Sequence, residues 1–276
     1  MSEKKNAKIV VVTSGKGGVG KTTSTAALGA ALAQEGQSVA VVDFDIGLRN
    51  LDLMMGAERR VIFDLINVIQ GNANLSQALI KDKRLENLYL LPASQTRDKN
   101  ALTEKGVLQV MEQLRSRFDW VICDSPAGIE RGAVLAMKHA DIAVIIANPE
   151  ISSVRDSDRI IGLLDAKTER AKKGQEVEKH LLITRYDTVR AGTGEMLAID
   201  DVSEVLSIPL LGIIPESREV LSASNLGVPV PVSNPACLPA KAYVQAARRL
   251  CGEDIEVTLP VSKKKLFANW FGGRAA

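Results

Sequence analysis

A glycine-rich stretch near the amino terminus has the spacing of a phosphate-binding loop. Residues 15–22 read G-K-G-G-V-G-K-T and match the pattern G-x-x-x-x-G-K-[ST]. Glycines let backbone N–H groups converge on phosphate oxygens, and a helix that begins there adds the positive end of its dipole. Lys21 is then expected to reach the β- and γ-phosphates, and the Thr22 hydroxyl to bind Mg²⁺. The nucleotide contacts that we expect are Gly15, Lys16, Gly17, Gly18, Val19, Gly20, Lys21, Thr22 and Thr23.

Aspartates follow two further apolar runs, at points where strands are expected to end. Asp43 and Asp45 come after residues 39–42, and Asp124 comes after residues 120–123. Ligands of such sheets bind at the carboxyl ends of the strands, and Mg²⁺ prefers oxygen ligands and retained waters. We therefore expect Thr22, Asp43 and Asp124 to bind Mg²⁺, directly or through water.

Asp45 is the candidate for positioning the water that attacks the γ-phosphate. Aspartate is a weak base at neutral pH, but phosphoryl transfer has a loose transition state, so orientation matters more than early proton removal. Strand-end capping or turn chemistry is the open alternative for both Asp43 and Asp45.

The last residues of the chain have the pattern of a helix that lies in a membrane interface. Residues 262–273 read S-K-K-K-L-F-A-N-W-F-G-G. At 100° per residue the large apolar side chains share one face, and the lysines suit anionic headgroups. The alternative is a helix that docks on the domain itself. The expected membrane contacts are Lys264, Lys265, Leu266, Phe267, Trp270 and Phe271.

These residues need a scaffold of buried strands and covering helices. Continuous apolar runs predict strands at 9–13, 39–43, 88–91, 120–124, 142–147, 181–184 and 210–214. Helical patterns lie between them, at 22–34, 103–117, 153–170 and 241–250. The alternation predicts an α/β fold with a mostly parallel, doubly wound sheet. We expect residues 1–252 to form this P-loop domain, and residues 253–276 to be a linker and the amphipathic tail.

Composition narrows the class of protein. The net charge is only +2, which gives no general case for nucleic-acid binding. Three cysteines without metal-ligand spacing suit a reducing cytosol. The polar start is not expected to be a signal peptide, and no apolar run reaches the roughly 18 residues of a spanning helix.

Lys16 gives the loop the form K-G-G-x-G-K-T-T, and here the chain resembles the deviant Walker A ATPases of the ParA/MinD family. In that family the first lysine contacts the nucleotide of the other subunit in a dimer. Residues 45–52, 91–99, 124–130 and 148–159 are similar to the septum-placement branch. The resemblance implies that Glu150 and Asp156 lie near the dimer face. From the residues alone, 150–159 is equally the charged start of a helix, which Ser152 or Ser153 could cap. The resemblance also places base contacts after late strands, where Arg185 and Pro215 are our choices.

The resemblance to this branch implies a function. ATP with Mg²⁺ would drive formation of a homodimer, which binds anionic lipids on the inner face of the cell membrane and recruits a MinC-like division inhibitor. A MinE-like activator would stimulate hydrolysis and return the protein to the cytoplasm. No specific nucleic acid is expected.

Three other functions fit the sequence less well. A ParA-like partition ATPase would bind DNA, which the aromatic tail and the near-neutral charge disfavour. An iron–sulfur electron donor would need suitably placed cysteines. A scaffold without turnover is disfavoured by the complete set of Lys16, Lys21, Thr22, Asp45 and Asp124.

Overall fold

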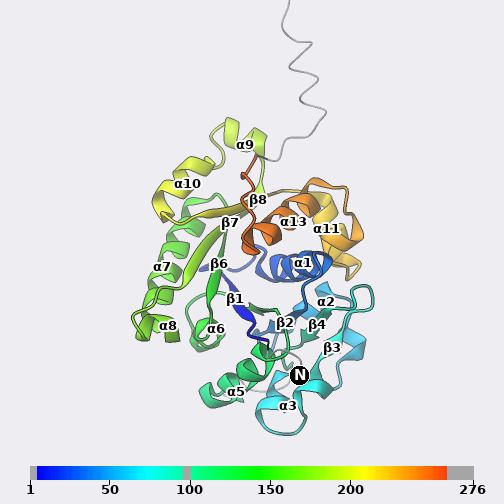
Figure 1. Cartoon of the computed structure of the whole chain (residues 1–276). Helices are drawn as coiled ribbons and strands as arrows, with labels where there is room; N and C mark the ends of the chain where they lie inside the picture. Colours follow the sequence, from blue (N-terminus) through cyan, green and yellow to red (C-terminus); the bar gives the residue numbers. More distant parts are fainter. Residues whose placement is uncertain (1–4, 96–100, 260–276) are drawn as a thin grey trace, which may run out of the picture.

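The computed structural model describes residues 5–95 and 101–259. It contains one eight-stranded sheet in the order β3-β4-β2-β5-β1-β6-β7-β8, which is parallel except for the antiparallel pair β3–β4 (Figure 1). The predicted doubly wound α/β fold is confirmed. The strands are β1 Lys8–Thr13, β2 Val39–Asp43, β3 Ile80–Lys81, β4 Leu88–Leu91, β5 Trp120–Asp124, β6 Ile142–Ala147, β7 Glu178–Tyr186 and β8 Leu210–Pro215.

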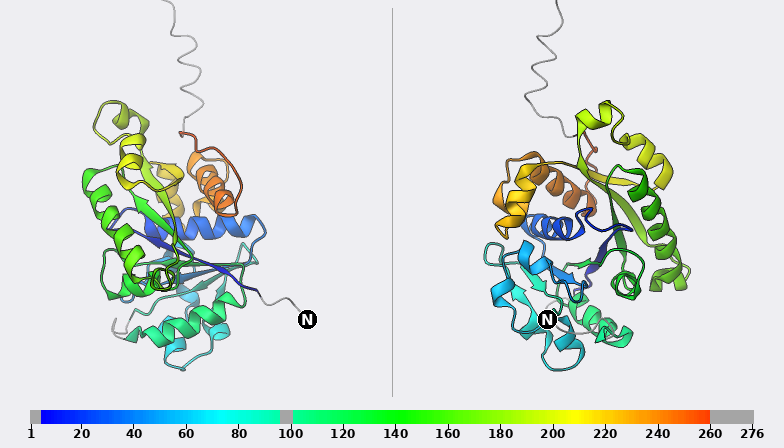
Figure 2. Two further views of the ribbon diagram at one scale, coloured as in Figure 1. Left: turned by 60° about the vertical axis from the view of Figure 1, so that its left-hand side comes forward. Right: turned by 180° about the vertical axis from the view of Figure 1, so that it is seen from behind.

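Helices cover both faces of the sheet (Figures 1 and 2). Strand β1 shows why, because Val10 and Val12 pack under α1 and α13 while Ile9 and Val11 pack toward α5, α6 and α7. The helices are α1 Lys21–Gln34, α2 Leu51–Met54, η1 Glu58–Arg60, α3 Leu65–Ile69, α4 Leu75–Ala78, α5 Glu104–Arg115, α6 Arg131–Met137, α7 Ile151–Lys167, α8 Glu169–Lys172, α9 Thr188–Gly192, α10 Ile199–Leu206, α11 Arg218–Asn225, α12 Val230–Ser233 and α13 Leu238–Leu250.

The sequence prediction was wrong at some boundaries. The two-residue strand β3 was missed, and β7 is longer at both ends than expected. The single helix expected over 153–170 is two helices, because Thr168 has an extended backbone and its side chain accepts a hydrogen bond from the Ala171 N–H, which starts α8. No helix among the described residues is long and apolar enough to span a membrane.

Helix α1 lies close to the centre of the sheet. It is rich in alanine and threonine, and most of its residues are buried. A Cβ atom at Gly29 would lie 2.6 Å from Val41 Cγ1 on β2, so only glycine allows this approach. The tight packing fixes the start of α1, and with it the phosphate loop, against the strand ends.

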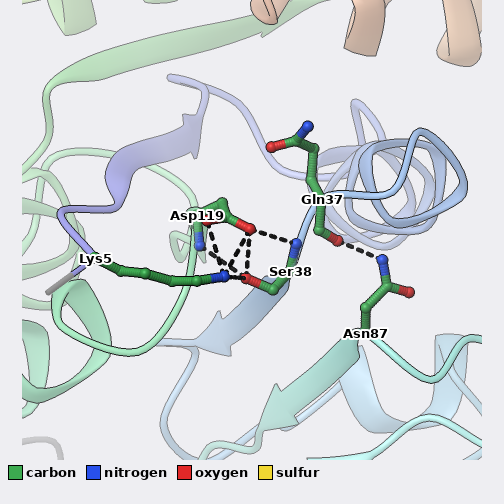
Figure 3. Close-up of polar contacts among 5 residues, drawn as sticks. All are labelled: Lys5, Gln37, Ser38, Asn87 and Asp119. Atoms are coloured by element: carbon green, nitrogen blue, oxygen red, sulfur yellow. Dashed lines mark hydrogen bonds and ion pairs between the residues drawn. The ribbon is translucent and has the colours of Figure 1, made fainter. Parts of the chain in front are cut away.

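The amino end of the sheet is closed by a cluster of paired polar groups (Figure 3). One carboxylate oxygen of Asp119 accepts hydrogen bonds from the Ser38 N–H at 2.9 Å and the Ser38 hydroxyl at 2.6 Å. The Lys5 ammonium group also lies 2.9 Å from Asp119. Nearby, the Asn87 side chain donates to the carbonyls of Gln37 and Ala33. These contacts tie the start of β2 to the start of β5 and to the residues before β4.

Candidate nucleotide site

The glycine-rich loop joins the end of β1 to the start of α1, as predicted. Gly18 and Gly20 have φ angles of +77° and +98°, which side chains rarely adopt, so the loop needs glycine there. At Gly15 a Cβ atom would lie 2.4 Å from the Asp156 carbonyl oxygen, so the loop also packs directly on α7. The first turn of α1 therefore presents its backbone N–H groups at the carboxyl end of the sheet, where a phosphate can bind.

Lys21 is held inside this loop. Its side chain is 8% exposed, and its ammonium group donates to the Ser14 hydroxyl at 2.9 Å. Burial lowers the pKa of Lys21, and the charges of Asp124 and Asp45 oppose this shift. The lysine is thus positioned between the loop and two carboxylates.

Asp43 and Asp124 lie side by side at the ends of β2 and β5, where they are register partners. Both are almost completely buried. Burial raises the pKa of Asp124 to about 7, although hydrogen bonds from Thr22 and Thr25 act to lower it. Burial and the charge of Asp124 raise the pKa of Asp43 as well. Two carboxylates so close together favour a bound cation, which would relieve their repulsion.

The oxygen ligands at this place suit Mg²⁺. Asp124 accepts a hydrogen bond from the Thr25 hydroxyl at 3.1 Å, and Thr22 lies within hydrogen-bond distance on the first turn of α1. Within the described ranges, no three histidine, cysteine or acidic side chains gather as a metal-binding group. Mg²⁺ commonly takes one or two carboxylates from a protein and its other ligands from phosphate and water, which the Asp124 and Asp43 carboxylates would suit.

Asp43 has a structural task that the sequence left open. One of its oxygens accepts the Asp45 N–H at 2.8 Å, and the other accepts the Leu51 N–H at 3.2 Å. The carboxylate thus holds both ends of the loop between β2 and α2. The strand-end capping that we weighed as an alternative is what these bonds show, and a further role toward Mg²⁺ stays a prediction.

Asp45 lies at the start of that loop. It is partly buried, and its charge acts on both Lys21 and Asp124. Its carbonyl accepts the N–H groups of Leu48 and Arg49, which makes a tight turn with Gly47 at a φ of +99°. The loop therefore brings the Asp45 carboxylate near Lys21 and Asp124. The predicted role of positioning the attacking water requires such a place.

Lys16 points away from the loop, toward α7. Its ammonium group lies 2.9 Å from a Glu150 carboxylate oxygen and donates to the Ser152 hydroxyl at 3.1 Å. Lys16 and Glu150 are both substantially exposed. The sequence suggested that Ser152 or Ser153 caps α7, and this was wrong. The hydroxyl of Ser153 instead accepts the Asn148 N–H, and no side chain caps the helix.

A cavity of about 570 Å³ opens beside the loop, and the two residues chosen for base contacts, Arg185 and Pro215, both line it. Arg185 has a φ of +55°, at the end of β7. The sequence missed Tyr243, whose buried hydroxyl lies 3.0 Å from the Ser24 hydroxyl on α1. It also missed residues of α11. The other lining residues are Val19, Gly20, Thr23, Thr184, Ile214, Glu216, Ser217, Arg218, Val220, Leu221 and Ser224.

The predicted membrane contacts lie outside the described residues. They are Lys264, Lys265, Leu266, Phe267, Trp270 and Phe271.

Comparison with known proteins agrees with this geometry. Residues 10–230 match the CobQ/CobB/MinD/ParA nucleotide binding domain. The septum site-determining protein MinD of Neisseria meningitidis serogroup B is 57% identical over 271 residues, which are 97% of this chain and 100% of that protein. The chain belongs to the MinD family.

Two solved MinD structures share the fold. In the MinC:MinD cell division protein complex of Aquifex aeolicus, the similar chain is 39% identical, has a TM-score of 0.80, and is matched over 92% of this chain and 100% of its own. MinD of Pyrococcus horikoshii complexed with Mg-ADP is 29% identical and has a TM-score of 0.79. The match covers 90% of this chain and 100% of that chain.

Membership of the MinD family gives the site its reaction. The chain is an ATPase of division-site placement, with ATP as nucleotide and Mg²⁺ as metal. The predicted family, function class and cofactors are confirmed. The roles of individual residues remain predictions.

Proposed function

We propose that this MinD-family chain alternates between a free form and an ATP-bound homodimer attached to the membrane. The observation that carries the proposal is the arrangement around Lys21. A buried lysine, a glycine loop and the Asp124 carboxylate converge beside a cavity of about 570 Å³. This suits a nucleoside triphosphate whose phosphates lie in the loop and whose base lies in the cavity.

Each side chain then has a distinct task. Lys21 binds the β- and γ-phosphate oxygens, while Thr22 and Asp124 hold Mg²⁺, with Asp43 behind them. Bound Mg²⁺ neutralises charge on the phosphates. Asp45 orients the attacking water, and its place at the start of the loop held by Asp43 supports this role.

Lys16 acts on the nucleotide of the other subunit. In the single chain it rests on Glu150 and Ser152 at the surface, beside the phosphate loop. To reach the partner it must leave these contacts, which are exposed and therefore weak.

A mixed dimer of one Lys16→Ala and one Asp45→Ala subunit tests this role. If Lys16 acts in trans, each site carries a defect and the dimer is nearly inactive. Recovery of up to half the normal activity would show that Lys16 acts in cis.

The division into residues 1–252 as ATPase domain and 253–276 as linker and tail is part of the proposal. Burying the four apolar side chains of one tail gains roughly 6–10 kcal/mol gross. Ordering about ten residues costs on the order of 10 kcal/mol, so one tail binds marginally. Two tails on a dimer bind about 10² to 10⁴ times more tightly. Dimer formation therefore controls attachment to anionic lipid at the inner face of the cell membrane.

The partners follow from the family. The Aquifex aeolicus structure is a complex of MinC with MinD. We propose that this chain likewise recruits a MinC-like inhibitor, and that a MinE-like activator stimulates hydrolysis and releases the protein to the cytoplasm.

Co-sedimentation with anionic vesicles in ATP, in ADP and without nucleotide tests the cycle. We expect the protein to bind vesicles in ATP and not in the other two conditions. Trp270→Glu should greatly reduce this binding while basal hydrolysis stays near normal, because it places a charge on the apolar face. Asn269→Glu, on the polar face, is the matched control. Equal loss in both variants would refute the amphipathic tail, and equal binding under all three nucleotide conditions would refute the cycle.

A further inference from the structure

The chain does not leave the body of the protein where α13 ends. Arg249, in the last turn of α13, donates through Nε to the Ile255 carbonyl at 2.6 Å and through Nη2 to the Glu256 carbonyl at 2.7 Å. Its third nitrogen, Nη1, donates to the Leu211 carbonyl on β8 at 2.8 Å. One guanidinium group thus joins α13, β8 and the segment after α13. We call residues 253–257 the C-terminal strap.

The strap covers an edge of the sheet. Strand β8 is the last in the strand order and, among the described residues, pairs only with β7, so its outer side would present unpaired carbonyls. Arg249 satisfies one of them, that of Leu211. In Figures 1 and 2 the orange-red end of the described chain runs along α13 and β8. The strap therefore lies where a free sheet edge would otherwise be.

Two further contacts show that the strap has a defined place. Val257 packs against the apolar cluster of β7, β8 and α10. On β8, Arg249 Nη1 passes Gly212 at van der Waals distance, since a Cβ atom at Gly212 would lie 3.8 Å from it.

We propose that Arg249 is the anchor of the C-terminal tail. It fastens the strap over β8, so that the residues after it start from a fixed point on the body. The three hydrogen bonds come from a charged donor, which makes them stronger than bonds between neutral groups. The exposed pair of Arg248 with Glu253, at 2.9 Å, adds little because water screens it.

The anchor has a consequence for membrane binding, which rests on the proposed function. With the strap fastened, residues 258–261 connect the body to the proposed membrane segment at 262–273. Without the anchor the connection begins at residue 253. The effective concentration of a second tail falls roughly as the −3/2 power of tether length, so release should weaken vesicle binding by about two- to fourfold.

Hydrogen exchange on the full chain without lipid tests the anchor directly. In Arg249→Ala we expect the amides of residues 253–257 to exchange on the order of tenfold faster or more, because the strap opens locally. Arg248→Ala is the matched control, since it removes a cation from the same turn and leaves the three bonds intact. Arg249→Lys should fall between the two and serves if the alanine variant does not fold. Unchanged exchange in both Arg249 variants would overturn the proposal.

Vesicle binding in ATP tests the consequence separately. Arg249→Ala should bind anionic vesicles about two- to fourfold more weakly at unchanged basal hydrolysis. Inserting five Gly/Ser residues after Leu259 should reproduce this loss while exchange in the strap stays slow. If the wild type fails to bind vesicles, the membrane proposal is wrong, and the exchange result still decides the anchor. If the wild type binds and Arg249→Ala binds equally well, the tether effect is wrong.

Discussion

Strand β5 has an aspartate at each end, and the two carboxylates lie in opposite surroundings. Asp119, just before the strand, accepts hydrogen bonds from Ser38 and Lys5 (Figure 3). Burial raises its pKa, but these hydrogen bonds outweigh burial and leave the pKa lowered. Asp124, at the other end, is fully buried beside Asp43, and its pKa is raised to about 7.

The difference separates stability from function within one strand. At the amino end the polar groups satisfy one another and hold three strands together. At the carboxyl end two buried carboxylates face each other, an arrangement that costs folding free energy and favours a cation. Such a site is expected where a ligand completes the electrostatics. Substitutions at the two ends should therefore affect different measurements.

The largest expected effect is on nucleotide binding, at the carboxyl end. Lys21→Ala removes the cation from the phosphate loop and should abolish ATP-dependent dimerisation, with ATP affinity lower by about tenfold to a hundredfold. Lys5→Ala, the matched lysine at the amino end, should leave both unchanged because its partner Asp119 is far from the loop. Calorimetric titration and sedimentation velocity measure the two quantities. Equal ATP affinity in both variants would contradict the assignment.

The next effect is on turnover alone. Asp45→Ala should keep ATP binding and dimerisation while hydrolysis falls by at least roughly tenfold, since the water loses its orienting carboxylate. The variant should therefore stay on vesicles in ATP. Phosphate release with and without an activator measures the loss. Hydrolysis at the original rate would assign the task to another residue.

The two ends of β5 also differ in how far the sequence predicts them: the phosphate loop at the carboxyl end was predicted, and the Asp119 cluster at the amino end was not. The phosphate loop lies within residues 9–22, and every signal for it is local. Buried strands were predicted because continuous apolar runs are typical of parallel sheets. Tyr243 and α11 were missed because chain folding brings them to α1 from about 200 residues away. The anchor at Arg249 was missed because its acceptors are backbone carbonyls, which leave no pattern in the sequence.

The third prediction concerns the amino end of β5 and the stability of the protein. Asp119→Ala leaves the N–H and hydroxyl of Ser38 without their carboxylate partner, and should lower the free energy of unfolding by about 2–3 kcal/mol. ATP hydrolysis per folded molecule should not change. Urea unfolding and a hydrolysis assay on the same sample separate the effects. A loss of activity without a loss of stability would mean that the two ends are coupled.

The smallest effect is the pH dependence of stability without nucleotide or Mg²⁺. The pKa of Asp124 is about 7 in the folded chain against an ordinary 3.8. The folded chain therefore keeps a proton that the unfolded chain has lost, and stability falls as pH rises between these values. From pH 6 to pH 7 we expect a loss of about 1 kcal/mol.

Asparagine variants at the two ends decide whether this slope belongs to the site. Asp124→Asn should reduce the slope of unfolding free energy between pH 6 and pH 7, and any remaining slope of the same sign belongs to Asp43, whose pKa burial also raises. The pKa of Asp119 is lowered, so its contribution is complete above the ordinary 3.8 and is lost only as pH falls through its folded value. Asp119→Asn should then lower the whole curve and leave the slope as in the wild type. If both variants keep the wild-type slope, another group titrates, and the contrast between the two ends of β5 does not set the pH response.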